Sequence, residues 1–74
     1  MVHFFEKDSG KAFELVKDSA EKGLAEGQLT LGEMLENGYT GTTDRQAAIE
    51  WYKKAAKNGN KAAKKNLQRL GVQS

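Results

Sequence analysis

Apolar residues recur every three or four positions along most of this chain, and short breaks that contain glycine separate these stretches. Such spacing places side chains on one face of an α-helix. Glycine closes a helix readily because it adopts the left-handed backbone conformation without steric cost. The pattern therefore predicts four helices, at about residues 9–22, 24–37, 44–58 and 60–70. The expected stops are Gly23, Gly38, Gly59 and Gly71, and the expected N-terminal caps are Asp8, Ser9 and Asp44.

The four predicted helices differ in the amount of apolar surface that they carry. The first two have one apolar stripe each, whereas the third has two, so we expect the third helix to pack between neighbours. The fourth has one short stripe among lysines and is expected to be a polar cap. In chain order the stripes are Ala12, Phe13, Val16 and Ala20; Leu24, Gly27, Leu31, Met34 and Leu35; Ala48, Trp51 and Ala55 with Ile49, Tyr52 and Ala56; and Ala63, Leu67 and Leu70.

The chain also repeats itself with an offset of about 36 residues. Seven identical residues coincide at this offset, and the conservative matches fall on the faces that the stripes assign to the interior. The sequence therefore predicts an all-α fold in a single domain, residues 1–74, with one helix pair at about 8–43 and a second at about 44–71. The identical pairs are Asp8 and Asp44, Ala12 and Ala48, Glu14 and Glu50, Lys17 and Lys53, Ala20 and Ala56, Gly23 and Gly59, and Leu31 and Leu67.

Length and composition limit the classes of protein to which the chain can belong. A chain of 74 residues buries only ~60% of the surface that it exposes when unfolded. The absence of cysteine excludes a disulfide framework, a thiolate nucleophile and a sulfur-ligated metal. The apolar run Val2–Phe5 is too short for a signal peptide or a membrane span, so we expect a cytoplasmic protein without a membrane segment.

Two helix pairs leave apolar surface at the ends of the fold, since repeat arrays usually need about three copies to bury a continuous core. We expect Val2, Phe4 and Phe5 to fold back onto the first helix pair as a lid. A second copy of the chain or a partner could cover the same surface instead.

One segment resembles a known family closely. Residues Leu31 to Gly59 have the sequence LGEMLENGYTGTTDRQAAIEWYKKAAKNG, which is similar to the Sel1-like repeat, a relative of the tetratricopeptide repeat. A weaker copy occupies Asp8 to Gly32, and the chain departs from the family pattern at Leu35, Tyr39 and Thr40. The resemblance implies a short right-handed solenoid of antiparallel helix pairs that acts as an adaptor or scaffold for protein partners, with no catalytic activity. It also implies that Trp51 and Tyr52 pack in the core.

No catalytic, cofactor-binding or metal-binding residue is predicted. The single histidine, His3, has no cysteine or second histidine to complete a metal or acid–base site. The carboxylate pairs Glu33 with Glu36 and Glu14 with Asp18 have the spacing of a solvated helix face. Neither a phosphate-binding GxxxxGK[ST] loop nor a GxGxxG motif is present. We therefore expect no cofactor and no enzymatic reaction.

The predicted partner site is the groove lined by the first helix of each pair, together with the loop after the second helix. The first helices carry charged residues of opposite tendency, which favours an electrostatically matched partner. Tyr39 lies in the loop, where no apolar stripe requires an aromatic residue. The candidate partner-binding residues are Glu14, Lys17, Asp18, Tyr39, Glu50, Lys53 and Lys54.

The C-terminal part of the chain is basic, since no acidic residue follows Glu50. Clustered lysines can contact phosphates, but they also serve as a solubilising cap or bind an acidic partner. Nucleic-acid binding is the less favoured interpretation because the stretch has a single arginine and its aromatic residues are expected to be buried. The candidate basic patch consists of Lys57, Lys61, Lys64, Lys65 and Arg69.

Three functions remain open at this point. The favoured one is a non-catalytic interaction module that binds a partner protein. The second is a small phage- or bacterium-encoded inhibitor that blocks a nucleic-acid-handling complex, and the third is nucleic-acid binding through the basic end. Self-association through an exposed repeat end is compatible with each of them.

Overall fold

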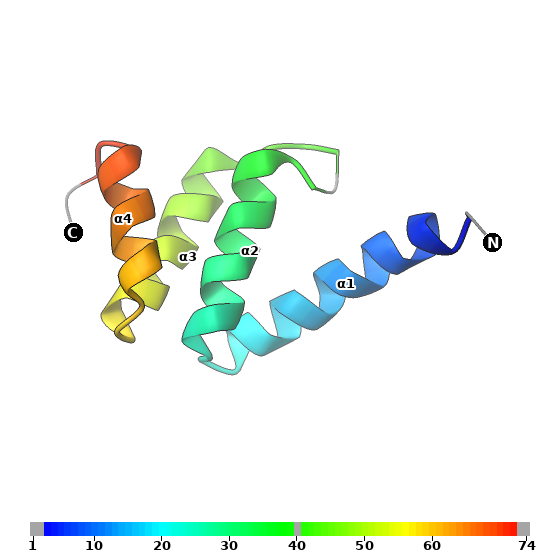
Figure 1. Ribbon diagram of the computed structural model, residues 1–74, viewed down its shortest axis with the longest axis horizontal. Coiled ribbons are helices and arrows are strands. Elements are labelled where there is room, and N and C mark those ends of the chain that lie inside the picture. The colour runs from blue at the N-terminus through cyan, green and yellow to red at the C-terminus, as the bar shows by residue number, and fades with distance from the viewer. Residues whose placement is uncertain (1–2, 40, 73–74) are drawn as a thin grey trace.

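A computed structural model describes residues 3–39 and 41–72 of the chain, with side chains from Lys11 onward. The helices are α1 (His3–Glu21), α2 (Ala25–Asn37), α3 (Arg45–Lys57) and α4 (Lys61–Arg69), and the described residues contain no strand. Each helix packs on the next one in sequence, in an elongated molecule of 43 × 23 × 15 Å. Successive helices run in alternating directions (Figure 1). The predicted all-α solenoid of antiparallel helix pairs is confirmed.

Helix α1 begins earlier than the sequence pattern predicts. It starts at His3 instead of at about residue 9, so Asp8 and Ser9 lie inside the helix and cannot cap its start. The backbone of Phe4 and Phe5 continues α1, without the turn that a folded-back lid would need, and Val2 lies outside the described residues. Figure 1 shows α1 meeting α2 near their connecting turn and diverging from it toward the N-terminus.

The helix ends are otherwise where the glycines predict them. Gly23, Gly38, Gly59 and Gly71 all have positive φ, between 73° and 93°. The Asp44 side chain accepts a hydrogen bond from the Ala47 amide at 3.0 Å, which confirms its predicted role as a cap. Asn60 caps α4 in the same way, accepting from Ala63 at 2.9 Å. Side-chain oxygens thus satisfy an amide at the start of each of these helices.

The core lies mainly in the second helix pair. Helix α3 packs between α2 and α4, as its two stripes predict, and small side chains on α3 allow its neighbours to approach closely. Tyr52 is fully buried and is the largest such side chain. In the first pair the equivalent residue, Val16, is only half-buried, because among the described helices only α2 packs extensively on α1. The core cluster consists of Ala48, Tyr52, Ala55, Ala56, Ala63 and Leu67.

A buried polar contact joins the two helix pairs. The Gln28 amide on α2 donates to the Ala20 carbonyl at 3.2 Å, and its oxygen accepts from Asn58 at 2.9 Å. Gln28 is 5% exposed, so leaving its amide unpaired would carry a desolvation cost. These bonds connect the end of α1, the first turn of α2 and the end of α3, and therefore tie the two repeats together.

Candidate protein-binding surface

The described residues contain no candidate metal centre. Side chains from Lys11 to Val72, apart from Thr40, include no group of three His, Cys, Asp or Glu residues arranged to hold a metal ion. His3 has no described side chain. None of the described helices combines the length and the apolar character of a membrane span. What the structure offers is a set of exposed side chains on the first helix of each pair.

The charged residues predicted for the partner site are all exposed. Glu14, Lys17 and Asp18 lie on α1, and Glu50, Lys53 and Lys54 lie on α3. Among the described residues no ion pair joins the α1 set to the α3 set; Asp18 instead pairs with Lys22 on its own helix, at 3.0 Å. That pair is solvent-exposed and so contributes little stability. These charges are therefore accessible to a partner.

Two apolar residues on the same helices are part of this surface, although the apolar stripes did not predict their exposure. Leu15 on α1 is 70% exposed, the highest value among the large hydrophobic residues described. Trp51 occupies the equivalent position on α3, 36 residues later. It is half-buried and lies outside the core cluster, so the prediction that it packs in the core is wrong, whereas the same prediction for Tyr52 is confirmed.

The reason is helical geometry: adjacent residues of an α-helix point about 100° apart, so the Trp51 indole points to a different side of α3 from the buried Tyr52 ring. There the Lys54 ammonium lies 4.4 Å from the ring centroid, a cation–π contact. The signal that could have found the pair is the repeat offset, because Leu15 belongs to none of the α1 stripes and aligns with Trp51. We call Leu15, Trp51 and the six charged residues above the first-helix face.

The surface of α1 is hollowed on both sides of Leu15. One hollow, of about 480 Å³, is lined by Lys11, Glu14, Leu15 and Asp18. The other, of about 270 Å³, lies between α1 and α2. An exposed leucine beside two hollows is the kind of feature that marks an interaction surface. The first hollow includes two of the predicted partner-binding residues.

Tyr39 lies apart from these charges. It follows Gly38, the left-handed residue that ends α2, and its amide donates to the Met34 carbonyl at 2.9 Å. Its side chain is 45% exposed. The loop joins α2 to α3 at the end of the molecule opposite the α1–α2 turn (Figure 1). Tyr39 is thus accessible, but the structure does not bring it next to Asp18 or Lys54.

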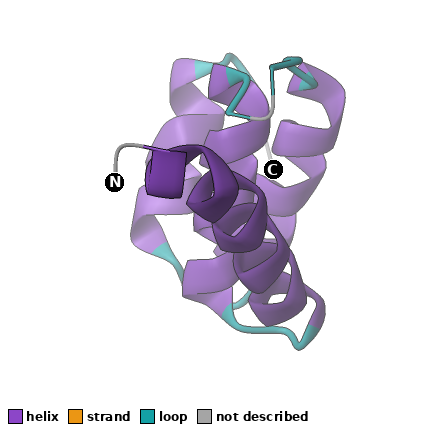
Figure 2. Cartoon of the chain, turned by 90° about the vertical axis from the view of Figure 1, so that its right-hand side faces the viewer, coloured by secondary structure: helices purple, strands orange, loops and turns teal. Residues whose placement is uncertain are grey.

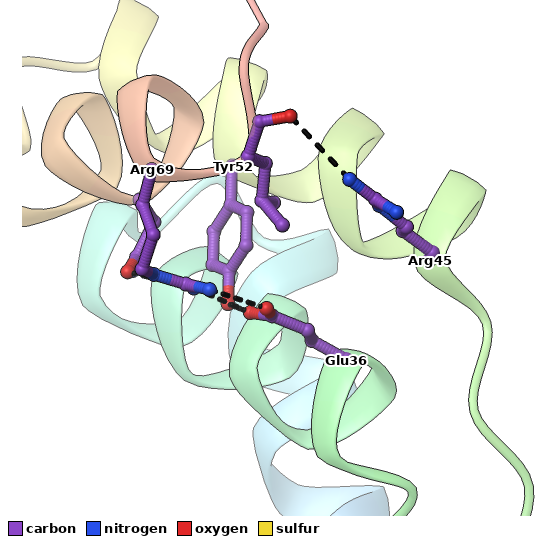
Figure 3. A network of polar contacts seen from close by, with 6 residues as sticks. Glu36, Arg45, Tyr52 and Arg69 are labelled. Carbon is purple, nitrogen blue, oxygen red and sulfur yellow. Dashed lines mark hydrogen bonds and ion pairs between the residues drawn. The ribbon is translucent and has the colours of Figure 1, made fainter.

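A polar network holds α2, α3 and α4 together (Figure 3). The Glu36 carboxylate accepts two hydrogen bonds from Arg69, each at 2.8 Å, and a third from the Tyr52 hydroxyl at 2.7 Å. Glu36 is only 18% exposed, so it is not the solvated carboxylate that its spacing from Glu33 predicts. The bonds from Arg69 lower the pKa of the Glu36 carboxyl, against the opposing effect of burial, and burial raises the pKa of Tyr52.

This network also distinguishes Arg69 from the other residues of the basic patch. Its guanidinium binds Glu36 in a bidentate manner, which is a structural contact. Lys57, Lys61, Lys64 and Lys65 are exposed, and none of them forms an ion pair with a described acidic residue. The available positive charge therefore belongs to the lysines around the α3–α4 turn.

The depressed pKa of Glu36 predicts an acid-sensitive contribution to stability. A carboxyl whose folded-state pKa is lowered stabilises the fold above its unfolded-state value, and the effect is lost as pH falls through the folded-state pKa. We expect the stability difference between the wild type and Glu36→Gln to shrink below about pH 4.5. Urea unfolding at several pH values measures it. Glu33→Gln, an exposed change on the same helix, is the matched control, and an equal pH response in both variants would contradict the assignment.

The comparisons with known proteins agree with this architecture. The family model of the Sel1 repeat matches residues 4–24 and 25–60. The chain is 39% identical over 64 residues to the "Chitin synthase regulator SKT5" of Saccharomyces cerevisiae, covering 86% of this chain and 9% of that protein. It is 37% identical over 68 residues to "Chitin synthase regulatory factor 3" of Schizosaccharomyces pombe, covering 92% of this chain and 7% of that protein.

The chain thus spans less than a tenth of the length of either relative. The likeness concerns the helical repeats and leaves most of each relative without a counterpart. No solved structure matches the chain significantly.

Proposed function

Because the chain belongs to the Sel1 repeat family, whose repeats mediate protein–protein interaction, we propose that it is a non-catalytic module that holds a partner protein on its first-helix face. The observation that supports this most directly is the equivalence of Leu15 and Trp51. Each repeat presents one accessible apolar side chain at the same position, with charged neighbours, which is the composition of an apolar contact with a polar rim.

The names of the two relatives support a regulatory role for the module. Both are described as regulators of chitin synthase. By this likeness we propose that the chain acts as an adaptor, binding an enzyme or another of its regulators without taking part in the reaction. The proposed inhibitor of a nucleic-acid-handling complex receives no support from these names.

The distribution of charge suggests how the partner is oriented. On α1 the face is acidic at Glu14 and Asp18, whereas on α3 the adjacent lysines Lys53 and Lys54 outnumber Glu50. A partner with basic residues opposite α1 and acidic residues opposite α3 would be attracted in one orientation and repelled in the reverse one. We propose that Tyr39 makes a separate contact at the end of the molecule.

Reversing these charges tests the proposal. We expect Glu14→Lys with Asp18→Lys, and separately Lys53→Glu with Lys54→Glu, to weaken partner binding about tenfold while the helical content stays unchanged. Partners are captured on immobilised protein and identified by mass spectrometry, and affinity is then measured from the fluorescence of Trp51, the only tryptophan, which a bound partner would shield from water. Lys61→Glu with Lys65→Glu is the matched control outside the face.

The same capture measures the nucleic-acid alternative. Binding through phosphate contacts weakens steeply between low and physiological salt and is abolished by nuclease. If retention follows nuclease and salt, and is lost in the control that reverses Lys61 and Lys65, the basic patch is the binding site. The proposal of a protein partner on the first-helix face would then be wrong.

A further inference from the structure

The hollow between α1 and α2 has an occupied counterpart in the same molecule. It is lined by Leu15, Val16, Ser19, Glu26, Gly27 and Thr30. The repeat offset of 36 residues carries these positions onto Trp51, Tyr52, Ala55, Ala62, Ala63 and Asn66, which belong to α3 and α4. The hollow on the first helix pair therefore corresponds to the side of the second pair on which α2 packs.

The contacts of α2 show how a helix fits that position. Gly32 lies against the Tyr52 ring, and a Cβ at residue 32 would be 2.6 Å from Cε1 of Tyr52. One turn further along, Glu36 binds Tyr52 of α3 and Arg69 of α4, with Arg69 also held by Asn66 (Figure 3). A small residue thus meets a large ring, and an acidic residue meets a cation.

The first helix pair presents the opposite size and the opposite charge. Val16 replaces Tyr52 and is half-buried, which leaves room that a glycine on the incoming helix would not fill. Glu33 replaces Arg69, and Glu26, which lines the hollow, lies two turns before Glu33 on α2. Both glutamates are exposed and form no ion pair with a described residue. Figure 2 shows α1 in front of the other helices, with none of the other described helices packed against its free side.

We propose that this groove binds an amphipathic helix from a partner protein. The helix would carry an apolar side chain larger than glycine where α2 has Gly32, and a basic side chain one turn further along, where α2 has Glu36. The occupant is inferred from the packing of α2 and from charge complementarity with Glu26 and Glu33. The groove shares Leu15 with the first-helix face but is otherwise a second surface, and the inference does not use the charged residues of that face.

A variant of the α2 segment can serve as a peptide probe of the groove. A peptide covering residues 24–38 of this chain with Gly32→Leu and Glu36→Lys has the predicted size and charge. A side-chain lactam between the carboxyl of Glu26 and the amine of a lysine introduced by Thr30→Lys, on the side away from the groove, would hold it helical, since a free peptide of this length is marginally helical in water. The control peptide carries Gly32→Leu alone and so keeps Glu36.

Binding is measured by NMR titration of the full chain at low salt. We expect peptide-induced shifts at Val16, Gly27 and Thr30. The peptide with Glu36→Lys (the lysine peptide) should bind at least about fivefold more tightly than the control peptide. Glu33→Arg in the protein should reverse that charge preference. Val16→Tyr should reverse the size preference toward a peptide that keeps Gly32.

The inference is overturned if the peptides leave the groove resonances unchanged, or if both peptides bind Glu33→Arg and the wild type in the same order. Sedimentation of the protein alone tests whether a second copy of the chain occupies the groove instead. Self-association with shifts at Val16 and at α4 would identify a second copy as the occupant and overturn the assignment to a partner. If the protein is a monomer and binds the lysine peptide as described, the assignment of the groove to a partner helix is supported. Reversing the charges of the first-helix face should weaken partner binding but leave peptide binding in the groove unchanged. The failure of one proposal is therefore distinguishable from the failure of the other.

Discussion

Replacing Tyr52 with alanine is expected to remove about 3–5 kcal/mol of stability, the usual cost of deleting a large buried aromatic side chain. Tyr52 is fully buried at the centre of the core, where it lies against Gly32 and donates to Glu36 at 2.7 Å. A domain of 74 residues has a total stability of about 4–11 kcal/mol. The variant should therefore lose most of its helical signal or melt far below the wild type, as measured by far-ultraviolet circular dichroism during thermal unfolding.

Two control variants separate the components of this loss. Tyr52→Phe keeps the ring and removes the hydroxyl, so we expect a cost of about 1–2 kcal/mol for one hydrogen bond to a carboxylate. Trp51→Ala removes a larger side chain that lies outside the core cluster, and we expect it to cost less than Tyr52→Ala. If the two alanine variants are equally destabilised, the placement of Trp51 outside the core cluster is wrong.

These adjacent aromatic residues show what a sequence pattern can and cannot predict. Periodicity placed both on apolar stripes, and burial follows from a stripe only when another helix covers it. Tyr52 is covered by α2, whereas Trp51 is half-buried and lies outside the core cluster. The start of α1 was missed for a related reason: Asp8 and Ser9 are good caps, but nothing in the preceding residues breaks a helix, so the helix continues to His3.

The stops and the internal repeat were predictable because they depend on local chemistry. The bonds between Glu36 and Arg69, and between Gln28 and Asn58, join residues 33 and 30 positions apart, and no local pattern encodes such pairs. The exposure of Glu14, Asp18 and Lys54 was predictable from helical spacing. Leu15 was not, since an isolated exposed leucine carries no periodic signal; only its alignment with Trp51 identifies it.

The second large effect is expected at Gly32, where we predict that Gly32→Ala destabilises the fold by about 2–3 kcal/mol. Alanine ordinarily stabilises a helix interior by about 1 kcal/mol relative to glycine. Here the added Cβ would lie 2.6 Å from the Tyr52 ring and 3.2 Å from the Ala48 carbonyl oxygen. The ring is buried and bonded to Glu36, so the strain of overpacking outweighs the gain in helix propensity. Chemical denaturation of the purified variant measures the loss.

The Tyr52→Val background identifies the cause of that loss. The added Cβ would lie 2.6 Å from Cε1 and 2.7 Å from Cδ1 of Tyr52. Valine, the residue at the equivalent position 16, has neither atom, so Gly32→Ala should cost much less in this background than in the wild type, and the difference is the coupling between the two positions. An equal cost in both backgrounds would show that the Ala48 backbone, and not the ring, requires glycine. The distinction matters for recognition, because only a fit between glycine and ring predicts that Val16, in the equivalent groove of the first pair, selects a larger residue on an incoming helix.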